Sequence, residues 1–206
     1  IPKLTSWINK AFETILNTKE NKQNSYLFNV FPGEHYRLLA GMVKVQKPKL
    51  IIEIGTYTGM SSRVILDNTE ESTEIYTFDI IEWHKFDSHL SKLDFENNRF
   101  KQITIDLSIN EEFNKYFSLL DKADIIFCDG PKDGKFEYKF SELICERKFT
   151  NKERYLIFDD IKFLNMIKLW RSIESPKIDA TSFGHWSGTG IVDISTRLKL
   201  NKNILC

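Results

Sequence analysis

The stretch that decides the fold is LIIEIGTYTGMSS, residues 50–62. Its first five residues, 50–54, are apolar except for Glu53, as is typical of a strand that is buried on both faces of a sheet. Gly55 and Gly59 follow, with small hydroxylated residues around them. Two interpretations stay open at this point. The loop is built to hold a ligand, or it is a tight turn in which glycine permits a positive φ or a close backbone approach.

Strand-like and helix-like segments alternate from residue 49 onward. The predicted strands are 49–54, 74–80, 100–105, 124–130 and 154–160, and the predicted helices are 60–67, 86–97, 110–120, 136–148 and 161–173. Because a helix separates each pair of strands, these strands should run parallel, with helices on both faces. The tail, residues 178–197, predicts two more strands joined by a glycine-rich turn. The sequence therefore predicts a doubly wound, Rossmann-like α/β fold. Its seven-stranded sheet should be mostly parallel and should end in a C-terminal antiparallel hairpin.

The N-terminal part reads as helical. Apolar residues at helical spacing predict a helix over 4–17, a polar loop over 18–25, and a second helix from about Glu34 to Val45 that ends before Pro48. We therefore expect an N-terminal helical cap segment, residues 1–33, ahead of a main domain, residues 34–206. The chain has no signal-peptide pattern at its start and does not begin with Met, so we expect the natural protein to extend further.

Composition excludes several classes of partner. Lys and Arg total 29 and Asp and Glu total 29, so zero formal charge gives no reason to expect nucleic acid or an anionic membrane. No apolar run is long enough to span a bilayer. The three cysteines have no metal-ligand spacing, and the simplest interpretation is reduced thiols in a cytoplasmic protein.

Acidic residues stand at the carboxyl end of every strand in the alternating part. They are Glu53, Asp79, Asp106, Asp129 and the pair Asp159 and Asp160. A single Asp after a strand is often a turn residue or a helix N-cap. On a doubly wound sheet, however, these ends converge on one crevice near the point where the strand order reverses. A cationic ligand, hydroxyl groups or a metal ion would relieve the repulsion between them.

The loop after the first strand does not fit the dinucleotide pattern. The pattern G-x-G-x-x-G needs glycine at position 57, where this chain has Tyr57. A nucleoside without a pyrophosphate is therefore the better ligand, and Asp79 is placed to accept hydrogen bonds from ribose hydroxyls.

The motif EIGTYTGMSS, together with FD at the end of the next strand, resembles the class I S-adenosylmethionine-dependent methyltransferases. It is most similar to the catechol and caffeoyl-CoA type O-methyltransferases, and the resemblance covers roughly Glu34 to Asp160. It implies S-adenosylmethionine as cofactor, with its methionine end by the first loop, its ribose on Asp79 and its adenine by Asp106. The implied cofactor-binding residues are Glu53, Gly55, Thr56, Tyr57, Gly59, Ser61, Ser62, Asp79, Ile80, Asp106, Leu107 and Asp129.

The same resemblance implies a metal site and a base. DIIFCDGPKDGKFEY resembles the family's fourth strand, where an Asp binds a divalent metal and a Lys three positions later acts as base; here these are Asp129 and Lys132. LIFDDI resembles the motif that supplies two further ligands, usually Asp-Asn, and here reads Asp159-Asp160. Three carboxylates suit Mg²⁺ or another hard divalent cation, although some relatives bind no metal. A base lysine should have a lowered pKa, and His185 competes for this role.

These observations predict an S-adenosylmethionine-dependent O-methyltransferase that acts on a small-molecule hydroxyl, a phenol or a sugar, with or without a divalent cation. Two alternatives remain: a nucleotide- or sugar-nucleotide-binding oxidoreductase, and a non-catalytic binding module on the same fold. His35 is either a ligand contact or a residue at the start of a helix. A homodimer is a further expectation from the resemblance.

Overall fold

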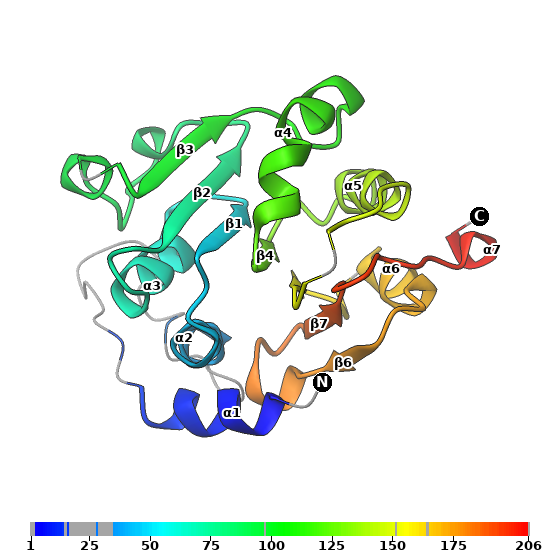
Figure 1. Cartoon of the computed structure of the whole chain (residues 1–206), viewed down its shortest axis with the longest axis horizontal. Helices are drawn as coiled ribbons and strands as arrows, with labels where there is room; N and C mark the ends of the chain where they lie inside the picture. The colour runs from blue at the N-terminus through cyan, green and yellow to red at the C-terminus, as the bar shows by residue number, and fades with distance from the viewer. Residues whose placement is uncertain are drawn as a thin grey trace.

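One mixed sheet organises the molecule. The computed structural model describes residues 3–14, 16, 28, 35–96, 98–150, 152–163 and 165–205. The described strands are β1 (Leu50–Ile54), β2 (Glu74–Asp79), β3 (Phe100–Thr104), β4 (Ile125–Cys128), β5 (Tyr155–Asp159), β6 (Lys177–Asp179) and β7 (Thr189–Asp193). Their order is β3-β2-β1-β4-β5-β7-β6 (Figure 1). Strands β1 to β5 pair in parallel, whereas β7 runs antiparallel to both β5 and β6. The predicted seven-stranded sheet and its C-terminal hairpin are confirmed.

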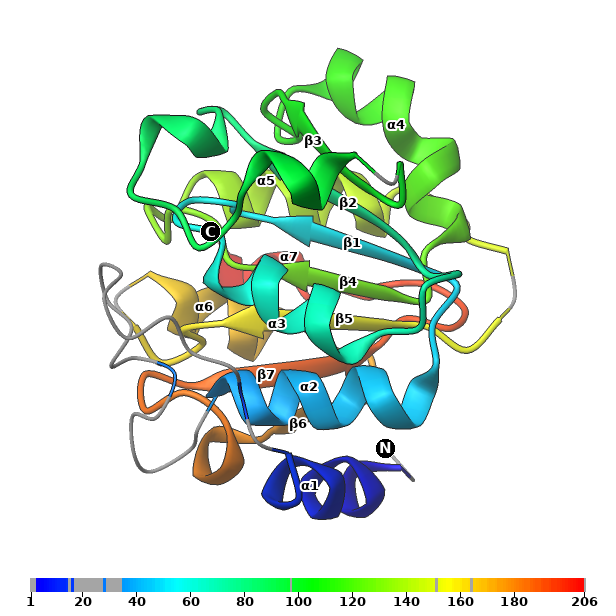
Figure 2. The ribbon, with the colours of Figure 1, turned by 90° about the vertical axis from the view of Figure 1, so that its left-hand side faces the viewer.

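Helices cover both faces of this sheet. They are α1 (Leu4–Phe12), α2 (His35–Gln46), α3 (Met60–Asn68), α4 (Asn110–Lys122), α5 (Phe136–Cys145), α6 (Met166–Ser172) and α7 (Lys202–Leu205). Short 3₁₀ turns lie at Trp83–Lys85, Lys92–Phe95 and Thr181–Phe183. Figure 2 looks onto the face that α2 and α3 cover, with α1 beside α2 and with α5 and α6 behind the sheet.

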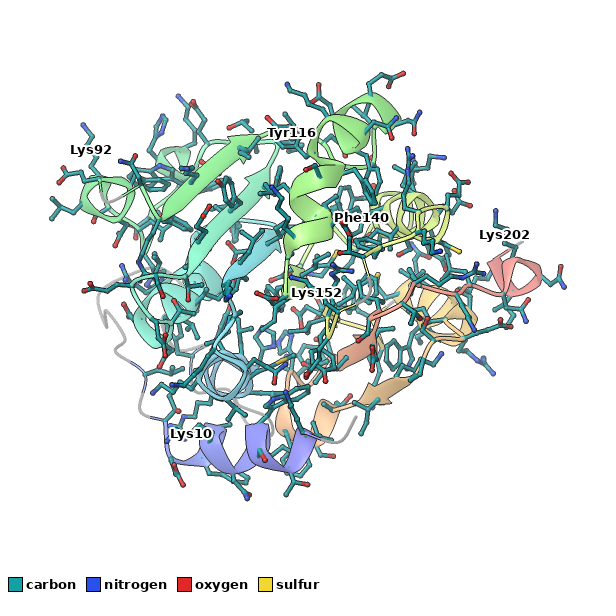
Figure 3. The ribbon with its side chains drawn as sticks, viewed as in Figure 1. Lys10, Lys92, Tyr116, Phe140, Lys152 and Lys202 are labelled. Atoms are coloured by element: carbon teal, nitrogen blue, oxygen red, sulfur yellow. The ribbon has the colours of Figure 1, made fainter. Side chains whose placement is uncertain are left out.

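The strand sequences are apolar because each face of the sheet packs into a hydrophobic core. In β1, Ile52 and Ile54 pack into the core beneath α4, α5 and α6, while Ile51 packs into the core beneath α2 and α3. Figure 3 places Phe140 of α5 inside the molecule and shows Lys92 and Lys202 extending outward at its rim. A strand with both faces covered has no solvent side, so its run of apolar residues is nearly continuous.

The prediction of a helix over 86–97 is wrong. Its described residues, 86–96, run irregularly past the loop after β1 and form only the 3₁₀ turn Lys92–Phe95. His89 donates its backbone N–H to the Thr58 carbonyl oxygen at 2.8 Å, and the Ser88 hydroxyl donates to the same oxygen at 3.0 Å. Ser91 and Asp94 form a capping box that begins the turn. Short polar side chains of this kind compete with the helix for backbone hydrogen bonds.

The predicted helix over 161–173 begins later, as α6 at Met166. The backbone N–H groups of Ile161 and Lys162 donate to the carbonyl oxygens of Gly188 and Ser187, at 3.2 and 2.8 Å. These hydrogen bonds hold the end of β5 against the turn that precedes β7. Residues 161–163 form a turn held by this neighbouring segment in place of the first turn of the predicted helix.

At the N-terminus, α1 ends at Phe12 rather than at residue 17, and the predicted loop over 18–25 lies outside the described residues. Trp7 is fully buried, with its ring 4.9 Å from that of Tyr155 in β5. A Cβ on Gly41 of α2 would overlap the Trp7 carbonyl oxygen, so glycine lets the two helices approach closely. The division into an N-terminal helical cap segment, residues 1–33, and a main domain, residues 34–206, remains a prediction.

Two observations bear on the expectations from composition. Among the described helices, none combines the length and the apolar character that crossing a bilayer would require. Cys128 and Cys145 both carry free thiols, and Cys128 is buried. Location in the cytoplasm remains a prediction.

Candidate active site

The strand order reverses between β1 and β4, and the loops that follow these two strands lie against each other. Gly55 donates its N–H to the Phe78 carbonyl oxygen, and Asp129 donates its N–H to the Ile54 carbonyl oxygen, each at 2.8 Å. Gly55 has a φ of +99°, and a Cβ on it would overlap the Asp129 carbonyl oxygen. Glycine is therefore needed at this position to bring the two loops together, which places the predicted residues of both motifs at one edge of the sheet.

Glu53 lies below this loop in a buried network of hydroxyl groups. Its side chain is fully buried and accepts a hydrogen bond from Ser62. Burial raises the pKa of Glu53 to about 7, although hydrogen bonds from Ser61, Ser62 and Thr77 act in the opposite direction. The Thr56 and Thr77 hydroxyls also pair, at 2.7 Å. Of the predicted cofactor residues, Glu53, Thr56, Ser61 and Ser62 thus support the loop from beneath.

Tyr57 and Asp79 connect the loop to the next strand end. Tyr57 has a φ of +40°, and its backbone N–H donates to Asp79 Oδ2 at 2.8 Å. Ile81 donates its N–H to Asp79 Oδ1 at 3.0 Å. A carboxylate has about four lone-pair positions, so Asp79 keeps acceptor capacity for further donors. Tyr57 is half exposed, with its ring 4.8 Å from that of Phe86, and the Ile80 side chain is 68% exposed.

The end of β3 is arranged differently. Asp106 Oδ1 accepts hydrogen bonds from both the backbone N–H and the hydroxyl of Ser108, at 2.8 and 2.7 Å. This is a local turn of the kind that aspartate often makes. Leu107 is buried in the core under α4. A contact between Asp106 or Leu107 and a cofactor remains a prediction.

The ends of β4 and β5 form an acid cluster, which we define as Asp129, Asp159 and Asp160. The Lys132 ammonium lies within it: it pairs with Asp129 Oδ1 and lies 3.0 Å from Asp160 Oδ2 and 3.9 Å from Asp159 Oδ2. Only 15% of the Lys132 side chain is exposed, and Asp159 is 6% exposed. The predicted metal ligands and the predicted lysine are therefore brought together, and the lysine supplies the positive charge that the carboxylates need.

His35 and His185 face the Oδ1 atoms of the cluster. His185 Nδ1 lies 3.3 Å from Asp159 Oδ1 and 3.2 Å from Asp160 Oδ1. Ser187 contacts both His185 Nδ1, at 2.9 Å, and the Asp160 carboxylate. His35, the first residue of α2, places Nδ1 3.7 Å from Asp159 Oδ1 and 3.4 Å from the Thr189 hydroxyl. The site is thus completed by His185 and Ser187, which precede β7, and by His35 at the start of α2.

The charges in the cluster shift the pKa values of its cations upward. Burial acts to lower the pKa of Lys132, but Asp129, Asp159 and Asp160 outweigh it and raise that pKa above its usual 10.5. Burial likewise acts against protonated His185, yet Asp159 and Asp160 raise its pKa to about 10. The expectation of a lowered lysine pKa is therefore wrong for this arrangement. A lysine among three carboxylates is stabilised in its charged form.

The carboxylates respond individually. Burial raises the pKa of Asp129, and the nearby Lys132 does not fully offset this. Burial acts in the same direction on Asp159 and Asp160, but it is outweighed. For Asp159 the opposing groups are His35, His185 and Lys132, and for Asp160 they are His185, Lys132 and Ser187, so both pKa values fall below the usual range. Asp159 and Asp160 are thus the members of the cluster that are held ionised.

One group of side chains in the described part of the chain has the geometry of a metal site. Ligand atoms of Asp159, Asp160 and His185 all lie within 4.8 Å of one another. Asp129, predicted as a ligand, does not join this group and faces Lys132 instead. Lys132 and Asp160 both have positive φ, +53° and +58°. Such strained residues often mark functional sites.

Sequence reasoning missed three participants. Ser187 and Thr189 were not singled out, although both closely follow His185, in and directly after the turn that leads into β7. Glu137 was also missed; it is buried and accepts a hydrogen bond from the Lys132 backbone N–H at 2.8 Å. In the sequence, the glycine-rich turn around His185 is the signal that could have pointed to Ser187 and Thr189.

Comparisons with known proteins identify the family and the fold of the chain. A family model described as "Methyltransferase domain" matches residues 52–161, which is more than half of the chain. Among curated protein sequences, none matches. Among solved structures, the chain is similar to an O-methyltransferase from Bacillus cereus in complex with SAH. The identity is 13% and the TM-score 0.50, over 98% of this chain and 91% of that chain.

Two further solved structures are similar. A proposed caffeoyl-CoA O-methyltransferase from Staphylococcus aureus has 16% identity and a TM-score of 0.51, over 83% of this chain and 85% of that chain. MycE methyltransferase from the mycinamycin biosynthetic pathway, in complex with Mg and SAH, has 13% identity and a TM-score of 0.50, over 74% of this chain. The chain spans 46% of the length of MycE in one crystal form and 30% in another. At these identities the structures establish the fold alone.

The family match runs from Ile52 to Ile161, so it includes the loop after β1, Asp79, Lys132 and the acid cluster. The resemblance stated from the sequence is confirmed at the level of the family. The chain belongs to the methyltransferase-domain family and has the fold of class I S-adenosylmethionine-dependent methyltransferases.

Proposed function

We propose that this protein transfers a methyl group from S-adenosylmethionine to a hydroxyl group of a small molecule, with a divalent cation held at the acid cluster. The observation that carries the proposal is the position of that cluster. Asp129, Asp159 and Asp160 surround one cationic group directly beside the loop that follows β1. Methyl transfer from a sulfonium requires chiefly that nucleophile, methyl carbon and sulfur be held in line, so adjacent cofactor and acceptor sites are the main requirement.

The cofactor would occupy the crevice on the β1 and β2 side. Asp79 holds the loop through the Tyr57 and Ile81 N–H groups and retains acceptor positions for the two ribose hydroxyls. The exposed Tyr57 ring and the exposed Ile80 would lie beside the ligand. The Bacillus cereus neighbour is a complex with SAH, which supports the choice of cofactor.

The residues at the acid cluster fit a divalent cation. Asp159 and Asp160 offer carboxylate oxygens, His185 offers a ring nitrogen once it has lost its proton, and the cluster already accommodates the positive charge of Lys132. Carboxylate oxygens are preferred by Mg²⁺, and the MycE neighbour is a complex with Mg. A bound cation would lower the pKa of an acceptor hydroxyl. The protein's own contribution is to fix the ligands, through Ser187 on Asp160 and His35 on Asp159.

Lys132 and His185 remain the candidate bases. Both hold a proton firmly in the present arrangement, because the same carboxylates surround them. Either side chain would therefore accept the acceptor's proton only when the negative charge around it is reduced. Assays of Lys132→Ala and His185→Ala at saturating substrate would separate the two. The variant that lacks the base should lose turnover over the whole pH range.

Binding of S-adenosylhomocysteine is the first test. A ligand at a hundredfold excess over its Kd stabilises a protein by about 2.7 kcal/mol. We expect S-adenosylhomocysteine to raise the Tm clearly and NAD to leave it unchanged. Stabilisation by NAD alone would contradict the proposal.

An acceptor screen tests the reaction itself. Phenols, catechols and sugars would be offered with labelled S-adenosylmethionine, in the presence of Mg²⁺ and of EDTA. If a hydroxyl-bearing acceptor is labelled with Mg²⁺ and not with EDTA, both parts of the proposal are supported. If EDTA does not reduce the labelling, the cation is not part of the reaction. Assembly as a homodimer also remains a prediction, which light scattering on the purified chain would decide.

A further inference from the structure

The Lys132 ammonium occupies the position at the acid cluster where an added cation would need to bind. It pairs with Asp129 Oδ1, lies 3.0 Å from Asp160 Oδ2 and lies 3.9 Å from Asp159 Oδ2. The side chain is 15% exposed. By contrast, Lys139 on α5 is 51% exposed and makes a surface pair with Glu142 at 3.6 Å. Lys132 is therefore not one more solvated lysine of this lysine-rich segment.

The local backbone directs Lys132 back into the cluster. Its φ is +53°, a left-handed backbone conformation that residues other than glycine rarely adopt. Its backbone N–H donates to Glu137 Oε1 at 2.8 Å, and Glu137 is 1% exposed in the first turn of α5. This fixed turn lets the lysine reach Asp129, only three residues earlier. A strained conformation persists only where the surroundings enforce it.

The same oxygens cannot serve two cations. His185 takes the Oδ1 atoms of Asp159 and Asp160, and the ammonium takes the Oδ2 side of both. A divalent cation that binds Asp159 and Asp160 needs these oxygens, and two positive charges a few ångströms apart repel each other strongly in a buried site.

We propose that Lys132 is a built-in competitor for the divalent-cation site, which fills the acid cluster with its ammonium group and leaves the carboxylates when a cation enters. This inference rests on the cation site of the proposed function. It adds that the affinity of the site is held down by the protein's own lysine, so that removal of the lysine's charge strengthens cation binding instead of weakening it.

The test measures binding of Mn²⁺ alone to the full chain, by calorimetry and by the loss of the free Mn²⁺ resonance signal. Lys132→Met removes the charge and keeps much of the length of the side chain. Lys132→Arg keeps the charge, and Lys139→Met removes the same charge from the surface of α5. We expect Lys132→Met to bind Mn²⁺ at least tenfold more tightly than the parent chain. Lys132→Arg should stay within about threefold of the parent because it keeps the charge. Lys139→Met should do so because the exposed pair of Lys139 with Glu142 is screened.

Circular dichroism and S-adenosylhomocysteine binding are recorded for each variant. If Lys132→Met does not fold, Lys132→Gln, which retains a polar head group, takes its place with the same expected result. Equal or weaker Mn²⁺ binding by the neutral variant would overturn the competition while leaving the cation site intact. No Mn²⁺ binding by any variant would overturn it together with the cation site, and S-adenosylhomocysteine binding would then show whether the methyltransferase assignment stands.

Discussion

The strand ends of β1 and β2 and those of β4 and β5 both carry buried or half-buried acids, but the two regions satisfy them by different means. Glu53 and Asp79 receive hydrogen bonds from hydroxyls and backbone N–H groups. Asp159 and Asp160 instead face the ammonium of Lys132 and the imidazole of His185. Neutral donors leave a carboxylate free to accept a ligand's hydroxyls as well, whereas charged partners mark a site where one cation can replace another.

The difference also explains the contrast in pKa. Without a cationic partner, burial raises the pKa of Glu53 to about 7. With two cationic partners, the pKa of Asp159 is lowered despite equal burial. The first region is therefore sensitive to pH and the second to loss of a charge partner.

The largest effect should come from Asp159→Asn. This change removes a buried carboxylate that faces His185 and Lys132, so both cations lose one of the carboxylates that compensate their charge. We expect the free energy of unfolding to fall by about 3 kcal/mol, measured by urea denaturation. The matched control is Asp179→Asn, which removes a surface pair with Lys162 at 3.2 Å and should cost about 1 kcal/mol or less. Equal losses would contradict the role assigned to charge pairing.

Glu53→Gln should give the next largest effect, as a change in pH dependence. The pKa of Glu53 is about 7 in the folded protein against 4.5 ordinarily. The folded state therefore binds the proton more tightly, and the stability that Glu53 contributes is complete below the unfolded pKa and is lost as pH rises through the folded one. Between these two pKa values, the free energy of unfolding of the parent should fall by about 3 kcal/mol relative to that of Glu53→Gln, which cannot ionise. Urea denaturation from about pH 4 to about pH 8 measures it, and parallel profiles would count against a raised pKa.

Most of the fold could be predicted from the sequence, because the strands are short apolar runs separated by helices. Leu50–Ile54 and Phe100–Thr104 lie within a residue of their predicted bounds. The failure at 86–97 arises because backbone N–H groups of this segment have other acceptors: that of Leu90 donates to the Ser88 hydroxyl and that of His89 to the Thr58 carbonyl oxygen. Side-chain competition of this kind depends on the neighbouring loop, which the local pattern does not reveal.

The site could be predicted in part. The acids were found because each follows a strand, and strand ends converge. Lys132 and His185 were named as candidate bases, but Thr189 was not found, because it and His35, which meet beside Asp159, are 154 residues apart in sequence. The direction of the Lys132 pKa shift failed for a related reason: it depends on distances to Asp159 and Asp160, which only the folded chain sets.

Asp79→Asn sharpens the comparison from the ligand side. The amide oxygen can still accept one of the two backbone N–H groups, so we expect a loss of about 1 kcal/mol in stability. Binding of S-adenosylhomocysteine should weaken about tenfold, since the amide nitrogen cannot accept from a ribose hydroxyl. Mn²⁺ binding should not change. A variant that lost Mn²⁺ affinity and kept S-adenosylhomocysteine affinity would reverse the assignment of the two regions.

Asp106→Asn should have the smallest effect, and it asks whether the end of β3 belongs with the cofactor region at all. Asp106 Oδ1 already accepts both donors of Ser108, and an asparagine oxygen can do the same, so stability should change by about 0.5 kcal/mol or less. If the second oxygen accepts a hydrogen bond from adenine, its replacement by an amide nitrogen should weaken S-adenosylhomocysteine binding about threefold, the value of one neutral hydrogen bond. Calorimetric titration measures this. An unchanged Kd would mean that Asp106 serves only its own turn, and that Asp79 is the one strand-end acid of this half of the sheet that contacts the cofactor through its side chain.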